Sequence, residues 1–310
     1  MSMDILLQRA LFLLLCISVF AYLLFSYGTA YAADVSEGSS RDSVLEELKA
    51  FERKIGFRKS GRNFQNNSSQ DAYYLCYATG KFSLPRTYFG MSFMRGTEKG
   101  CGFDVSENDI FVYRVEAIAR NNTPVTRSLL ESTLERFIFV VFHEDYHEEI
   151  PEEARKKPDI DEAAATMMAM AMAIDFARET YGEDSRIYQD LLLEPTLFLQ
   201  KALIVNKYYE KLDLLYKEYR YSAITEEEAT TRKAGFFYLL RNECSSITPP
   251  PKTFNQCPNV FNNAGLVLDT AYTRYFPQMY QAWLRHDRNA KKLFEAFQKY
   301  LPDMQGVLQD

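Results

Sequence analysis

Histidine is the scarcest of the side chains that could carry chemistry in this sequence: its 310 residues include only His143, His147 and His286. The 36 lysines and arginines, set against 42 acidic residues, form no basic block. Because a nucleic-acid-binding protein needs a positive surface to neutralise phosphates, we do not expect a nucleic-acid partner. The chain is 47% hydrophobic and 25% charged, which is typical of a globular protein and excludes a disordered or collagen-like one.

One long apolar run is present, and it lies near the N-terminus. Residues 10–27 are almost continuously apolar, and residues 30–32 read Ala-Tyr-Ala, the small-x-small pattern that a signal peptidase recognises. We therefore expect residues 1–32 to be a signal peptide. Since the run approaches the length that spans a bilayer, an uncleaved membrane anchor through residues 10–27 is the alternative. Both interpretations predict a periplasmic or secreted protein, anchored to the inner membrane in the second case.

Cysteine usage agrees with export. Beyond Cys16 in the leading segment, the chain has Cys76, Cys101, Cys244 and Cys257, an even number that is typical of an oxidising compartment. Four cysteines allow three pairings. We expect nearest neighbours to pair, the first with the second and the third with the fourth, and four buried thiols are the alternative.

The pattern of the mature chain, residues 33–310, predicts a single α+β domain. Residues 43–55 have apolar side chains at helical spacing, and residues 72–115 hold short aromatic and β-branched runs typical of a small antiparallel sheet. After a turn at 121–124 we expect a helical body, residues 125–310, with helices at 125–149, 160–181, 195–221, 225–242, 264–285 and 289–300. Its methionines alternate with alanines and are expected to fill the core rather than bind copper: Met167, Met168, Met170 and Met172.

The strongest motif lies at residues 143–147, which read His-Glu-Asp-Tyr-His directly after the apolar run 137–142. Charged groups beside a buried helix are costly unless they are paired or bind a metal. On a helix, the i, i+4 spacing places both imidazoles on one face, where they can bind one Zn²⁺ while Glu144 reaches a water at the metal. A helix end with two solvated histidines is the alternative.

The third zinc ligand is expected to be a carboxylate, because His286 is distant in sequence. Glu148 and Glu149 lie too close to the histidines along the helix to complete a tetrahedral site. Glu162 is the candidate, since it falls in the first turn of the next helix and is followed by small residues that allow close helix packing. An ordinary charge at a helix N-terminus is the alternative for Glu162.

These motifs resemble a family of predicted bacterial zinc aminopeptidases, metallopeptidases of the glutamate-zincin kind, over most of the mature chain. The family's H-E-L-A-H-Q motif is similar to residues 143–148, and its N-E-S-F-A-T motif to residues 161–166. Its L-N-N-A motif, with a later Tyr and Pro, is similar to residues 261–264 with Tyr272 and Pro277. Its F-S-L element is similar to residues 82–84.

The resemblance implies a zincin-like fold with one zinc ion on His143, His147 and Glu162. It implies hydrolysis of peptide substrates by a zinc-activated water, with Glu144 as the general base. Tyr272 is the candidate that stabilises the oxyanion, and a core tyrosine is its alternative.

Departures from the family pattern bear on substrate preference. Asp145 and Tyr146 replace Leu-Ala within the motif, Asp161 replaces Asn, and the family's Y-S-T-L-G segment is replaced by residues 118–124. The amine-binding G-x-M-E-N motif of other zinc aminopeptidases is absent, so aminopeptidase character rests on the resemblance alone. Two other functions stay open: a catalytically silent zincin-fold protein that binds partners at the membrane surface, and a hydrolase of non-peptide substrates.

Overall fold

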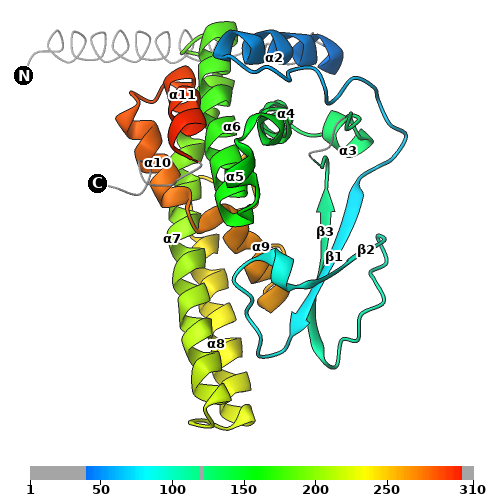
Figure 1. Ribbon diagram of the computed structural model, residues 1–310, viewed down its shortest axis with the longest axis vertical. Helices are drawn as coiled ribbons and strands as arrows, with labels where there is room; N and C mark the ends of the chain where they lie inside the picture. Colours follow the sequence, from blue (N-terminus) through cyan, green and yellow to red (C-terminus); the bar gives the residue numbers. More distant parts are fainter. Residues whose placement is uncertain (1–39, 119–121, 302–310) are drawn as a thin grey trace, which may run out of the picture. The chain divides into compact units, whose positions relative to one another are not determined.

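The computed structural model describes residues 40–118 and 122–301 (Figure 1). The predicted signal peptide or anchor, residues 1–32 with the apolar run 10–27, lies outside the described residues. The chain divides at Ser40, and the fold belongs to the second unit, Arg41–Asp310. None of the helices in the described ranges has both the length and the apolar character needed to cross a membrane.

The predicted antiparallel sheet is confirmed and has three strands in the order β2-β1-β3: β1 (Tyr73–Gly80), β2 (Ser92–Arg95) and β3 (Asn108–Val115). The central strand β1 pairs with β3 along its whole length, from Tyr73 opposite Val115 to Gly80 opposite Asn108. A 3₁₀ turn, Tyr88–Gly90, precedes the short edge strand β2.

The rest of the described chain is mainly helical, so the fold class is α+β as predicted. The helices are, in chain order, α2 (Arg41–Ile55), α3 (Arg127–Leu130), α4 (Leu134–Glu149), α5 (Glu152–Arg155), α6 (Pro158–Tyr181), α7 (Arg186–Arg220), α8 (Glu226–Ser245), α9 (Asn263–Thr273), α10 (Phe276–Arg285) and α11 (Ala290–Tyr300).

Three of the expected helices differ clearly from the prediction: the one at 125–149 is divided into α3 and α4, and proline is involved in the other two. The helix expected at 264–285 is broken between α9 and α10, because Pro277 lacks an N–H and is suited to the first turn of a new helix. Helix α7 begins nine residues before the expected start at 195. Its N-cap Ser185 accepts a hydrogen bond from the Tyr188 N–H, and Pro195 lies inside the helix.

Helices α4 and α6 form the centre of the hydrophobic core. Helix α6 begins with Pro158 and ends at Tyr181, and the C-cap Gly182 has a φ of +83° that suits glycine. The alanines and methionines between these ends are buried on every side of the helix, so the predicted core role of the methionines is confirmed. Small alanine side chains let neighbouring helices approach closely, and α6 packs against α4, α7, α9, α10 and α11.

Helix α9 lies between the sheet and the antiparallel α7–α8 hairpin (Figure 1). Asn262 caps α9, and its side-chain amide donates to the Ile110 carbonyl of β3 at 2.8 Å. The Asn263 amide donates to the Lys81 carbonyl at 2.9 Å and accepts from the Tyr216 hydroxyl of α7 at 2.6 Å. The two asparagines therefore tie α9 to both of its neighbours and to Lys81, the residue before the segment 82–84.

Both predicted disulfides are present, Cys76–Cys101 and Cys244–Cys257. The first joins β1 to the loop between β2 and β3, and the second joins the end of α8 to the loop that leads to α9. Two such bonds are typical of proteins in oxidising, non-cytoplasmic compartments.

Asp145 anchors α4 to the N-terminal helix. Its buried carboxylate forms an ion pair with Lys49 of α2 and accepts from the Asn63 amide at 3.0 Å. Removing one partner of a buried ion pair leaves the other charge uncompensated, which is more costly than losing a surface pair.

Asp145→Ala is therefore expected to lower the free energy of unfolding by about 3–5 kcal/mol, because the buried ammonium of Lys49 loses its closest partner. Urea denaturation of residues 33–310 measures this. The control is Asp213→Ala, whose partner Lys217 is half exposed and whose loss should cost less than about 1 kcal/mol. Equal losses of stability in the two variants would show that Glu52, 3.6 Å from Lys49, is enough to compensate the charge of Lys49.

Candidate metal centre

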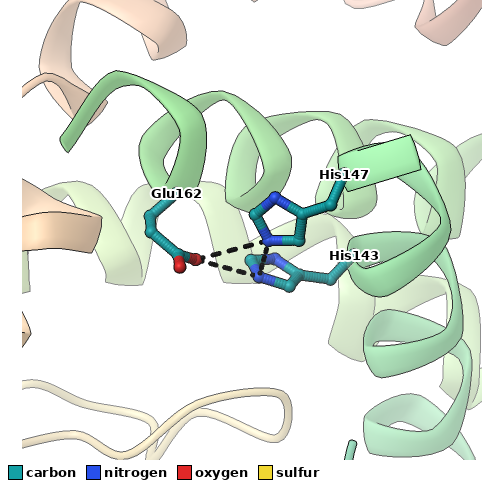
Figure 2. A group of neighbouring side chains, drawn as sticks. All are labelled: His143, His147 and Glu162. Carbon is teal, nitrogen blue, oxygen red and sulfur yellow. Dashed lines mark hydrogen bonds and ion pairs between the residues drawn. The ribbon is translucent and has the colours of Figure 1, made fainter. Parts of the chain in front are cut away.

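Two helix segments position the three predicted metal ligands. Helix α4 starts at the N-cap Thr133 and ends just before Pro151, and it carries His143 and His147 on one face, one turn apart. The short α5 returns the chain so that the first part of α6, with Glu162, lies beside the last turns of α4. Figure 2 shows the two imidazoles and the carboxylate pointing toward one another.

The spacing of the ligand atoms fits a tetrahedral zinc ion. The Nε2 atoms of His143 and His147 are 3.1 Å apart, and Glu162 Oε2 lies 3.3 Å and 3.4 Å from them. Zinc bonds of about 2.0–2.1 Å in tetrahedral geometry place neighbouring ligand atoms about 3.3–3.4 Å apart. Within the described part of the chain, the ligand atoms of these three residues lie close enough to one another to hold a metal ion.

The electrostatics of the group also favour a cation. Burial alone would raise the pKa of Glu162, but the imidazoles of His147 and His143 outweigh it and lower that pKa to about 2. Burial opposes a positive charge on His147, yet the carboxylates of Asp161 and Glu162 raise its pKa well above the ordinary value. A metal ion that binds His147 Nε2 therefore displaces a proton.

Asp161 orients His147. Its Oδ1 lies 2.8 Å from His147 Nδ1, the ring nitrogen on the side away from Glu162. A carboxylate in this place holds the proton on Nδ1 and leaves the lone pair of Nε2 for a metal. The largely buried side chain of Asp161 therefore contacts the candidate site rather than solvent.

Glu144 and Tyr272 line the same cavity of about 390 Å³ as the three ligands. Burial raises the pKa of Glu144, although the two imidazoles partly oppose the shift. The ring of Tyr272 stacks on His143, with centroids 6.1 Å apart and planes at 28°. All of the predicted site residues, from α4, α6 and α9, thus meet at one cavity.

The cavity also holds charged and phenolic side chains that the sequence analysis missed. Arg136 pairs with Glu116, with its Nη2 2.8 Å from Oε2, and Tyr113 of β3 lies beside Tyr272. Lys201 and Asp269 form a second ion pair in the wall. The sequence spacing could have predicted Arg136 at the cavity, because this residue precedes His143 by seven positions and so lies on the same face of α4.

Four residues of the motif region do not line the cavity: Asp145, Tyr146, Glu152 and Glu153. Asp145 and Tyr146 are buried on the side of α4 that packs into the core. Glu152 and Glu153 lie in the one-turn helix α5 and have exposed side chains. Asp145 and Tyr146 therefore contribute to the packing of α4 and not to the lining of the cavity.

No protein-family model, curated protein or solved structure matches this chain.

Glu162→Ala is expected to lose most bound zinc. Only two ligands, the imidazoles of His143 and His147 on α4, then remain. The measurement is the zinc-to-protein ratio after dialysis, by elemental analysis, with about one ion expected for the unaltered chain. Glu148→Ala removes another carboxylate of the same cavity and should keep the zinc. Full occupancy in Glu162→Ala would place the third ligand elsewhere.

Asp161→Ala is expected to weaken zinc binding by about 10–100-fold without abolishing it, because the His147 ring loses the acceptor that fixes its orientation. Competition with a chromogenic chelator measures the affinity. Asp159→Ala is the matched control, since Asp159 lies on the same helix turn but faces Arg274 at 3.7 Å. An unchanged affinity in Asp161→Ala would mean that the carboxylate does not orient the ring.

Proposed function

We propose that this chain is an exported zinc metallopeptidase with a zincin-like fold, and an aminopeptidase by the family resemblance. The observation that carries the proposal is the 3.1–3.4 Å spacing of the three ligand atoms at a cavity that also contains Glu144 and Tyr272. A structural ion pair would need neither a second carboxylate beside the imidazoles nor a cavity over them.

His143, His147 and Glu162 would hold the zinc ion. Bound there, zinc would supply an activated water and polarise the scissile carbonyl. Glu144 takes one proton from the attacking water as the water oxygen bonds to the carbonyl carbon. It then returns that proton to the leaving nitrogen as the C–N bond breaks, which yields one acid and one amine. The raised pKa of Glu144 suits a group that must both accept and release a proton.

Tyr272 donates a hydrogen bond to the oxyanion in this proposal. Burial, reinforced by the charge of Glu162, raises the pKa of Tyr272 well above its ordinary value, so its hydroxyl keeps the proton that it must donate. The stacking on His143 holds the ring next to the metal ligands. These contacts favour the proposed role over that of a core tyrosine.

The cavity and the disulfides agree with a peptidase outside the cytoplasm. About 390 Å³ falls in the range of pockets that hold small ligands, so a short peptide segment fits. Glu144 is intact, which favours an enzyme over a silent binding protein. The predicted signal segment supports export.

Glu144→Gln is expected to lower peptide hydrolysis by about 10²–10⁴-fold, because the amide cannot accept the proton of water. The zinc-to-protein ratio should stay unchanged, since Glu144 is not among the ligands. Fluorogenic peptide libraries with the zinc-loaded chain, residues 33–310, measure the activity, and Glu148→Gln is the control that keeps it.

Retained activity in Glu144→Gln would exclude Glu144 as the base. Absence of hydrolysis by the zinc-loaded unaltered chain would favour the binding protein at the membrane surface. Cleavage of ester or amide substrates but no peptide would favour the non-peptide hydrolase.

A further inference from the structure

A second polar cluster lies in the wall of the cavity that holds the metal ligands. Lys201 of α7 and Asp269 of α9 both line this cavity, and their side chains are only 5% and 17% exposed. Lys201 Nζ lies 3.1 Å from Asp269 Oδ1 and donates to the Asn255 carbonyl at 2.8 Å. The rings of Phe198 and Phe254, with centroids 5.9 Å and 5.8 Å from Nζ, flank the ammonium and fix its place.

The cluster is close to the reacting end of the cavity. Asp269 precedes Tyr272 by three residues on α9, so the two side chains share a helix face and are about one turn apart. Tyr272 stacks on His143. A peptide held at the metal ligands can therefore extend a side chain past Tyr272 to Lys201 and Asp269.

Both members of the pair have unused hydrogen-bonding capacity. An ammonium group has three donors, and Lys201 uses two of them within the described part of the chain. Asp269 Oδ2 is buried and finds no hydrogen-bond partner among the described residues, and neither does the hydroxyl of Thr166, which also lines the cavity one turn after Glu162. A buried acceptor without a partner costs free energy that a suitable ligand recovers.

The charge balance decides which group fits. Lys201 and Asp269 neutralise each other. A cationic side chain would therefore be repelled by the ammonium of Lys201, and an anionic side chain would be repelled by the carboxylate of Asp269. An apolar side chain would leave Asp269 Oδ2 and the third donor of Lys201 without hydrogen-bond partners among the described residues. A neutral carboxamide satisfies both, because its NH₂ donates to Asp269 and its carbonyl accepts from Lys201.

We propose that Lys201 and Asp269 form a specificity subsite for a carboxamide side chain, glutamine or asparagine, of the peptide substrate. The inference rests on the proposed peptidase function and names the substrate class of that cavity. Sites that hydrogen-bond a polar substrate group reject analogues lacking it far more strongly than apolar pockets reject a missing methylene.

The test uses zinc-loaded chain, residues 33–310, and quenched fluorogenic peptides in which each position in turn is Gln, Asn, Leu, Met, Lys or Glu. At one position, kcat/KM for Gln should exceed that for Leu by roughly tenfold or more. The double variant Lys201→Met/Asp269→Leu should invert the Gln-to-Leu ratio. The isosteric Asp269→Asn should bring the Gln-to-Leu ratio near one, because the NH₂ group of the new asparagine then faces the NH₂ group of the substrate glutamine.

The ratio compares two substrates on one sample, so a partly unfolded variant does not distort it. Lys207→Met is the control: it removes a lysine of the same helix whose partner, Glu243, lies on α8, and it should leave the ratio unchanged. A ratio near one in the unaltered chain, or one that neither variant changes, would overturn the subsite while peptide cleavage upholds the proposed function. Absence of any peptide cleavage would overturn the proposed function, and the subsite with it.

Discussion

The close packing of α4 against α6 is the contact on which the whole candidate metal centre depends. Ala163, Ala164 and Ala165 follow Glu162 directly, and each is fully buried. With larger side chains in their place the two helix axes would separate, and the carboxylate of Glu162 could not reach within 3.4 Å of both imidazoles. Bringing two carboxylates and two imidazoles into a buried site is costly unless they pair with one another or with a metal. The core packing therefore supplies the free energy that holds this cluster together.

The opposite side of the cavity is positioned by different contacts. Helix α9 carries Asp269 and Tyr272, and the hydrogen bonds of Asn262 and Asn263 fix it against β3, the Lys81 carbonyl and α7. The proposed metal ligands thus come from the helical core, whereas the proposed oxyanion and specificity groups come from a helix tied to the sheet. A change at the asparagines should disturb the cavity wall while the ligand spacing stays intact, because α4 and α6 do not depend on those hydrogen bonds.

The parts of the site that could be predicted from the sequence are those encoded over short distances. The two histidines are one helix turn apart, Asp161 and Glu162 are adjacent, and the small residues after Glu162 indicate tight packing. The pairs Arg136–Glu116 and Lys201–Asp269 join residues 20 and 68 positions apart, and no local pattern connects their members. The early start of α7 was missed for a related reason: tertiary packing tolerates Pro195 inside a helix, while its sequence pattern suggests a boundary.

One turn of α6 reaches both nitrogens of a single imidazole, which explains why two adjacent acidic residues stand at this point. Glu162 Oε2 approaches His147 Nε2 at 3.4 Å, and Asp161 Oδ1 approaches Nδ1 of the same ring at 2.8 Å. Neighbouring residues on a helix point about 100° apart, so they can flank a ring that lies across the helix axis. Asp145 in turn prevents α4 from shifting, since it binds Lys49 on the core side of the same helix. Asp145 and Tyr146 are therefore constrained by the core. Asp161 and Glu162 on α6 are constrained by the imidazole of His147, which they flank.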